Sequence, residues 1–221
     1  MTRFKKISFG LSFTTVLAVL FLFSSVRVSA EELKPIKLSE PRMKRGKTLM
    51  ESLEERQSAR SFSSKPLPPE VLSDLLWAAF GVNRPASGKR TAPSARDWQE
   101  IDIYVSMEKG LYLYDARQHT LIPILGKDIR ALCGLQDFTQ QAPVNLIYVA
   151  NISKMGGDKT VTDFYSAVDT GFISQNVYLF CASERLSTVV LGMVNRVELA
   201  KAIGLTTDQK IILAQPVGYP E

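Results

Sequence analysis

Residues that support metal, nucleophilic or disulfide chemistry are scarce in this chain. Its 221 residues include one histidine, His119, and two cysteines, Cys133 and Cys181. A histidine-based catalytic triad or a zinc site is therefore not expected, and we predict that His119 is a solvated residue in a turn between two strands. The cysteines could pair in an oxidising compartment, but Cys181 lies in an apolar helical stretch typical of a core, which favours free thiols.

Two signatures of nucleotide and nucleic-acid binding are also missing. No G-x-G-x-x-G pattern follows a predicted strand, so a Rossmann nucleotide domain is not expected. The chain holds 27 Lys and Arg against 22 Asp and Glu, but its first 30 residues contain four of these bases and no acid. The remaining residues hold 23 bases against 22 acids. A basic surface for nucleic acid is therefore not expected.

The amino terminus has the pattern of an export signal. Arg3, Lys5 and Lys6 precede an apolar run over residues 7–26, and small residues at positions 28 and 30 predict cleavage after Ala30. We therefore assign residues 1–30 to a signal peptide and expect an exported, periplasmic protein that is free of the membrane after cleavage. An uncleaved membrane anchor is the alternative, because the run is nearly long enough to span a bilayer.

Helical and strand patterns alternate loosely over residues 48–221 and predict one α+β, or three-layer mixed α/β, domain behind a polar arm over residues 31–47. Helices are predicted over residues 48–55, 68–81, 128–135, 162–184 and 197–203. Strands are predicted over residues 101–107, 143–150, 188–193 and 210–217, with a hairpin over 111–125 and a loop over 82–96.

Two guanidinium groups and a hydroxyl lie within five residues of one another at Arg56, Ser58 and Arg60. Arginine presents a planar fork of donors and stays charged, so this spacing suits a phosphate dianion. The alternative is a solvated helix end, in which the two arginines pair with Glu51 or Glu55.

Several segments follow one another in an order that resembles the FMN-dependent nitroreductase family, and in particular its short, exported, azoline-oxidase-like members. The resemblance extends from about residue 48 to residue 220. The segments that carry it are residues 56–62 (RQSARSF), 75–79 (LLWAA), 93–95 (PSA) with Gln99, 142–144 (APV), 171–176 (ending in Gln-Asn) and 217–220 (VGYP).

The resemblance implies a nitroreductase-like fold, with a central, mostly antiparallel sheet flanked by helices, in an intertwined homodimer. It also implies that the flavin ring carries the chemistry, without a catalytic side chain. Asp97 stands where the family commonly has Asn, and Gln175 and Asn176 are expected to be buried hydrogen-bonding groups. The residues that the resemblance places around FMN are Arg56, Gln57, Ser58, Arg60, Pro93, Ser94, Ala95, Asp97, Gln136, Leu191 and Gly192, of which the second subunit supplies those at 93–97.

The activity implied by the resemblance is ping-pong transfer of hydride or electrons to nitroaromatic or quinone acceptors, with NAD(P)H as a possible donor. One alternative is an exported flavin dehydrogenase that oxidises a small or peptide-derived substrate. Another is a non-catalytic envelope protein that keeps the fold. Two departures bear on this choice: Arg185 replaces a helix-capping glycine, and the chain ends at Glu221 without a basic tail.

Overall fold

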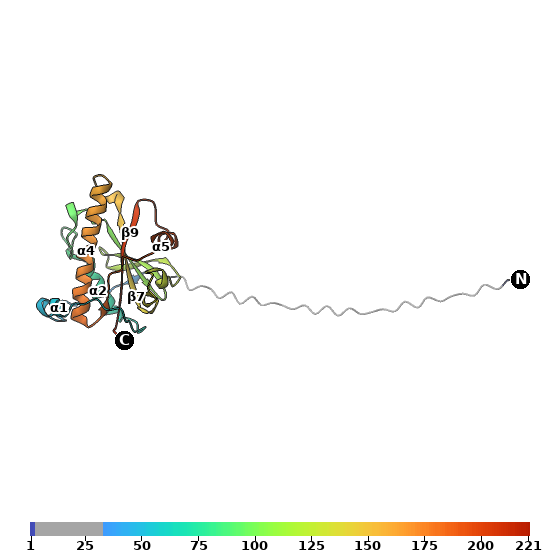
Figure 1. The fold of residues 1–221 in the computed structure, drawn as a ribbon, viewed down its shortest axis with the longest axis horizontal. Coiled ribbons are helices and arrows are strands. Elements are labelled where there is room, and N and C mark those ends of the chain that lie inside the picture. Colours follow the sequence, from blue (N-terminus) through green and yellow to red (C-terminus); the bar gives the residue numbers. More distant parts are fainter. Residues whose placement is uncertain (3–32) are drawn as a thin grey trace. The chain divides into compact units, whose positions relative to one another are not determined.

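The computed structural model describes residues 1–2 and 33–221 (Figure 1). The predicted signal peptide and its cleavage site after Ala30 lie outside the described residues. Residues 33–221 belong to one compact unit. Within the described part of the chain, no helix combines the length and the apolar character needed to cross a bilayer.

A seven-stranded sheet, in which every neighbouring pair is antiparallel, forms the centre of the fold. The strand order is β1 (Ile36–Lys37), β6 (Thr120–Leu125), β5 (Gly110–Asp115), β4 (Ile101–Met107), β7 (Val144–Asn151), β9 (Gln209–Gly218) and β8 (Ser187–Thr188). The predicted α+β fold with a mostly antiparallel central sheet is confirmed. The apolar run over residues 143–150 is β7, which lies between β4 and β9 as a buried central strand.

Helices cover both faces of this sheet and give three layers. The α-helices of the described part are α1 (Leu49–Glu55), α2 (Pro69–Phe80), α3 (Phe138–Gln141), α4 (Lys159–Glu184) and α5 (Arg196–Ile203). Side chains alternate along β7, so that Leu146 and Tyr148 join a core cluster with α2 and α4. Ile147 and Val149 point the other way and join a second cluster with α5. Figure 1 shows α4 and α5 on opposite sides of β7 and β9.

The long helix α4 begins and ends at residues whose chemistry fits those positions. The Asp158 side chain accepts a hydrogen bond from the Val161 N–H at 3.0 Å, which starts the helix three residues before the predicted position 162. At the other end, Arg185 adopts the left-handed conformation, with φ 56° and ψ 39°. A glycine would adopt this conformation without steric cost.

We expect Arg185→Gly to stabilise the protein by about 1 kcal/mol, because glycine removes the Cβ clash of a left-handed residue. In a domain of this size the melting temperature should rise by about 2–4 °C. Gly204, the left-handed residue that ends α5 at φ 71°, provides the reciprocal control. An added Cβ at Gly204 would meet no heavy atom within 4 Å, so Gly204→Ala should lower stability through backbone strain alone. Calorimetry of the two variants measures both shifts, and no gain from Arg185→Gly would contradict the expectation.

Four sequence predictions of local structure are wrong in extent. The predicted helix over 128–135 is reduced to a 3-10 turn at Arg130–Leu132, because the Asp128 carboxylate accepts from the Arg130 N–H and guanidinium instead of allowing a longer helix. The predicted loop over 82–96 contains a hairpin of β2 (Val82–Arg84) and β3 (Lys89–Arg90). The predicted strand over 188–193 is limited to β8 and one bridge, and the arm contributes strand β1.

His119 differs from the predicted solvated turn residue. It adopts φ 47° in the turn between β5 and β6, but its ring is half-buried between two partners. Its Nε2 lies 2.7 Å from Ser73 Oγ and its Nδ1 lies 2.9 Å from Tyr114 Oη. Burial lowers the pKa of His119, so the neutral ring ties the turn to α2.

Two further predictions concern the amides Gln175 and Asn176 of α4 and the two cysteines. Asn176 is half-buried and donates from Nδ2 to the Ala79 carbonyl at 3.4 Å, as expected for a structural hydrogen-bonding amide. Gln175 is exposed, so its predicted burial is wrong, because it lies on the outer face of α4. Cys133 and Cys181 are buried free thiols that belong to different core clusters.

Candidate functional site

The arginine-containing segment that follows α1 lies along the edge of the sheet formed by β8. The Ala59 N–H donates to the Thr188 carbonyl at 3.0 Å, and the Ser63 N–H donates to the Tyr219 carbonyl at 2.9 Å. Phe62 is buried, with its ring centroid 5.6 Å from that of Phe138. These anchors hold the segment in place while its polar side chains, Gln57, Ser58 and Arg60, stay exposed.

Tyr178 of α4 organises the start of this segment. Its hydroxyl lies 2.9 Å from Ser58 Oγ and accepts a hydrogen bond from the Val190 N–H at 2.9 Å. The Arg56 guanidinium lies over the Tyr178 ring, 5.4 Å from the centroid. Tyr178 was not among the predicted site residues, although a tyrosine within an apolar helix needs a partner for its hydroxyl.

The ion pairs expected for a solvated helix end, between the two arginines and Glu51 or Glu55, are not formed in the described chain. The Glu51 carboxylate accepts from the Thr48 N–H at 2.7 Å and caps α1. Glu55 pairs with Lys47 instead of with an arginine of the segment. Among the described residues, Arg56 and Arg60 form no ion pair, which leaves both guanidinium groups available to an anion.

The backbone at Leu191 and Gly192 continues this edge. Leu191 exchanges backbone hydrogen bonds of 2.8 and 3.1 Å with Ala214. Gly192 is exposed, and a Cβ there would meet only the Leu213 side chain, at 4.0 Å. Within residues 33–221 the Gly192 N–H has no hydrogen-bond partner, so this donor is available to a ligand.

Gln136 lies against the same edge. The Leu135 N–H donates to the Met193 carbonyl at 3.0 Å, which joins residues 134–136 to residues 191–193. The Gln136 Oε1 atom is buried and has no hydrogen-bond partner in the described part of the chain. A buried amide oxygen without a donor is uncommon and favours a ligand or water partner. One chain therefore brings together Arg56, Ser58, Leu191, Gly192 and Gln136.

The segment Pro93–Ala95 lies elsewhere in the same chain. The Ala95 N–H donates to Asp169 Oδ2 at 2.8 Å, and Ser94 Oγ donates to Glu100 Oε2 at 3.2 Å. Asp169 and Tyr178 are nine residues apart in α4, which corresponds to about 13–14 Å along the helix axis. Exposed Asp97, whose Oδ1 accepts from the Gln99 amide at 3.0 Å, belongs to this second group. The structure therefore does not bring Pro93–Asp97 to the Arg56–Arg60 segment of its own chain.

Two buried carboxyl groups support the Pro93–Ala95 segment. Glu100 and Asp169 are 0% and 1% exposed, and their side chains contact each other. Burial, and then the charge of Asp169, raise the pKa of Glu100 to about 7. Glu100 therefore holds its proton up to near neutral pH.

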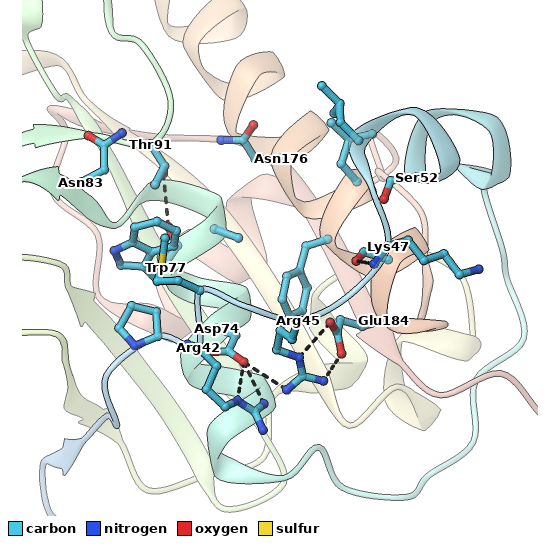
Figure 2. Close-up of a pocket in the computed structure, with 17 residues that line it drawn as sticks. Arg42, Arg45, Lys47, Ser52, Asp74, Trp77, Asn83, Thr91, Asn176 and Glu184 are labelled. Carbon is cyan, nitrogen blue, oxygen red and sulfur yellow. Dashed lines mark hydrogen bonds and ion pairs between the residues drawn. The ribbon is translucent and has the colours of Figure 1, made fainter.

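A separate cavity of about 430 Å³ lies between the arm, α1, α2 and α4. Figure 2 shows Arg45 between Asp74 and Glu184, with Arg42 on the other side of Asp74. Burial raises the pKa of Asp74, but Arg42 Nε donates to it at 2.9 Å. The cations of this cavity are thus neutralised within the chain, and they fasten the arm to α2 and α4.

Comparison with known proteins agrees with the fold and with the order of the segments. A family model described as the nitroreductase family matches residues 53–219. A relative from Methanocaldococcus jannaschii, named as a candidate nitroreductase, is 33% identical over 183 residues, covering 77% of this chain and 90% of the relative.

Solved structures show the same similarity. A candidate nitroreductase from Ralstonia eutropha JMP134 superposes with a TM-score of 0.82 and 41% identity, covering 87% of this chain and 91% of that chain. The NADPH:FMN oxidoreductase of Vibrio harveyi, complexed with NAD+, shares the fold with a TM-score of 0.60 and 19% identity, covering 78% of this chain and 69% of that chain. The chain therefore belongs to the nitroreductase family of oxidoreductases.

Proposed function

We propose that the protein is an FMN-dependent oxidoreductase that takes hydride from a donor such as NAD(P)H and reduces nitroaromatic or quinone acceptors in ping-pong order. FMN would supply the ring that carries the hydride. The observation that best supports this function is the Gly192 edge, because the absent side chain and the unpaired N–H allow a flat ring to approach the backbone closely. The unpartnered Gln136 Oε1 beside it is a fitting acceptor for a ring N–H.

The residues after α1 suit the polar part of FMN. Arg56 and Ser58, both held by Tyr178, would bind the phosphate or ribityl chain. Arg60, an exposed cation without an ion pair among the described residues, would favour negative charge on the pyrimidine side of the ring. Gln57 lies between Arg56 and Ser58 in the sequence and is exposed, so it would be a further polar contact.

We also propose that the active form is a homodimer. Helix α1 exposes Leu49, Met50 and Leu53, at 62%, 72% and 45%, although their helical spacing is typical of a buried face. Helix α4 exposes Phe164 and Phe172, at 60% and 45%. Exposed apolar residues of this size favour a protein interface. We propose that a second copy packs there and brings its Pro93–Ala95 segment to the flavin of its partner.

The direct test is a visible absorption spectrum of residues 31–221 after incubation with FMN and desalting. The unmodified protein should retain flavin absorbance that NADH bleaches and a quinone restores. Arg60→Ala should weaken FMN binding by about 10–100-fold, because it removes a charge-assisted contact. Lys201→Ala removes one positive charge from α5, away from this edge, and should leave FMN affinity unchanged.

The remaining outcomes separate the alternatives. Retained flavin that NADH does not bleach would favour a dehydrogenase acting on a small or peptide-derived substrate. Failure to retain flavin would overturn the proposed function and favour a non-catalytic protein. Export to the periplasm remains part of the proposal and is supported by the leader pattern of residues 1–30.

A further inference from the structure

Four basic side chains surround a second cavity, which lies beside the Pro93–Ala95 segment. The cavity has a volume of about 370 Å³. Arg84, Lys89 and Arg90 reach it from the β2–β3 hairpin, and Arg96 reaches it from the turn that follows. Its only acidic lining residue is Asp97. The cavity therefore has an excess of positive charge.

The cations of this cavity lack the carboxylate partners found at the cavity of Figure 2. Of the ion pairs formed by the described residues, none includes Arg84, Lys89, Arg90 or Arg96. Arg42 and Arg45, in contrast, are both paired with Asp74 (Figure 2). Like charges around one cavity repel one another, and a bound anion would relieve that repulsion.

Two of the guanidinium groups are fixed by neutral acceptors. Arg90 Nε donates to Gln99 Oε1 at 2.8 Å, its Nη1 donates to the Phe80 carbonyl at 3.0 Å, and its guanidinium lies 4.9 Å from the Phe80 ring centroid. Arg84 Nη2 donates to the Arg90 carbonyl at 2.9 Å. Since a guanidinium has five N–H donors, each group keeps donors for a ligand while its position is already set.

The backbone of the adjoining turn is strained. Arg96, Asp97 and Gln99 have φ values of 51°, 59° and 48°, in the left-handed region that non-glycine residues rarely adopt. Such strain persists where surrounding structure enforces it and is common at ligand-binding segments. Here the enforcing contacts include the Ser94 Oγ that accepts from the Gln99 N–H at 2.8 Å, so the turn holds Arg96 beside the cavity.

We propose that this cavity binds the phosphate or carboxylate group of the molecule that exchanges electrons with the flavin. The proposal rests on the proposed function, because Pro93 and Ser94 line the cavity and belong to the segment assigned to the flavin site of the dimer. Guanidinium groups fixed in this way recognise planar or tetrahedral oxyanions through paired hydrogen bonds. The substrate class is therefore an anionic donor or acceptor, with its charged group held away from the ring.

The first experiment measures inorganic phosphate binding to residues 31–221 by calorimetry at constant ionic strength, with and without FMN. The double variant Arg84→Gln with Lys89→Gln changes two exposed residues. It removes the Arg84 hydrogen bond to the Arg90 carbonyl but leaves the contacts of the half-buried Arg90 side chain with Gln99 and Phe80 intact. We expect phosphate binding to weaken at least tenfold in this variant. Lys127→Gln with Lys201→Gln is the matched control and should bind phosphate as the unmodified protein does. Equal phosphate binding by all three proteins would overturn the proposal.

Kinetics with a neutral quinone acceptor identify the source of the anion. One outcome is that, in the Arg84/Lys89 variant, the KM for NADPH rises at least tenfold while the KM for NADH rises less and the KM for the quinone does not rise. This result would support a phosphate-bearing donor. A rise for a carboxylate-bearing quinone, with no change for NADPH, would support an anionic acceptor. Weaker binding of FMN with unchanged binding of riboflavin would overturn the assignment, because the cavity would then serve the cofactor phosphate.

The two proposals can fail separately. If the protein retains no FMN but binds phosphate through Arg84 and Lys89, the proposed flavin function is wrong. The cavity is then an anion site for another ligand, and its assignment to a substrate that exchanges electrons with flavin is overturned. If the protein retains FMN but the variant binds phosphate normally, the anion site alone fails.

Discussion

Phe172→Asp is expected to convert the protein from a dimer to a monomer that no longer retains FMN. Phe172 is 45% exposed on the outer face of α4, and Phe164, two turns earlier, is 60% exposed. An aspartate there would bring an unpaired charge into the proposed apolar interface, at a cost of several kcal/mol. The dimer dissociation constant should therefore increase by about 10²–10³-fold. Sedimentation or light scattering measures the oligomeric state, and absorbance after desalting measures retained FMN.

The loss of flavin is expected because one chain cannot close the site alone. Ser58 and the Pro93–Ala95 segment contact α4 at Tyr178 and Asp169, about 13–14 Å apart along the helix. Ile124→Asp is the matched control, because Ile124 is 41% exposed on β6, toward the far edge of the sheet. This control should remain dimeric and keep FMN. A Phe172→Asp protein that stays dimeric, or a monomer that retains FMN, would contradict the proposed assembly.

Helix α1 shows what the residue pattern predicts and what it does not. Spacing correctly predicts a helix at Leu49, Met50 and Leu53, but period indicates only that one face is apolar, not what covers that face. Only Ser52 of α1 is buried in the chain. Only the three-dimensional fold shows that Leu49, Met50 and Leu53 keep 62%, 72% and 45% of their surface exposed within the described chain.

Contacts between distant residues set the other limit of prediction. The left-handed Arg185 and the strand β7 arise from local patterns, and both were predicted correctly. Tyr178 joins Ser58 across 120 positions, and His119 joins Ser73 across 46. Neither pair has a local signal, because long-range hydrogen bonds depend on strand register and helix packing, which residue spacing does not encode. The same reason explains why the burial of His119 was missed.

Glu100→Gln is expected to raise the stability of the protein above pH 7 and to remove a pH dependence below it. Folded Glu100 keeps its proton up to about pH 7, whereas an unfolded glutamate loses it near its usual pKa of 4.5. Between these values the folded state binds more protons, so stability falls as pH rises from about 4.5 to 7. Above pH 7 Glu100 is ionised in both the folded and the unfolded state. The loss in the free energy of unfolding is then complete and amounts to a few kcal/mol.

The glutamine variant has nearly the same shape and cannot ionise, so it should avoid this loss. Its melting temperature at pH 8 should exceed that of the unmodified protein by roughly 5–10 °C, and the difference should shrink toward pH 5. Glu70→Gln on the exposed start of α2 is the matched control and should show no such difference. Calorimetric melting between pH 4.5 and 8.5 provides the measurement. If the melting temperature of the Glu100→Gln variant changes with pH as that of the unmodified protein does, Glu100 is not the group that causes the pH dependence.

This titration bears on function because Glu100 holds the segment that the homodimer is proposed to use. Ser94 Oγ donates to the Glu100 carboxyl, and the Ala95 N–H donates to the neighbouring Asp169. When Glu100 ionises, two carboxylates without a shared proton repel each other beneath this segment. FMN should therefore dissociate faster above pH 7 from the unmodified protein, but not from the glutamine variant. If FMN dissociates from the unmodified protein at equal rates at pH 6 and pH 8, the ionisation of Glu100 does not affect flavin binding.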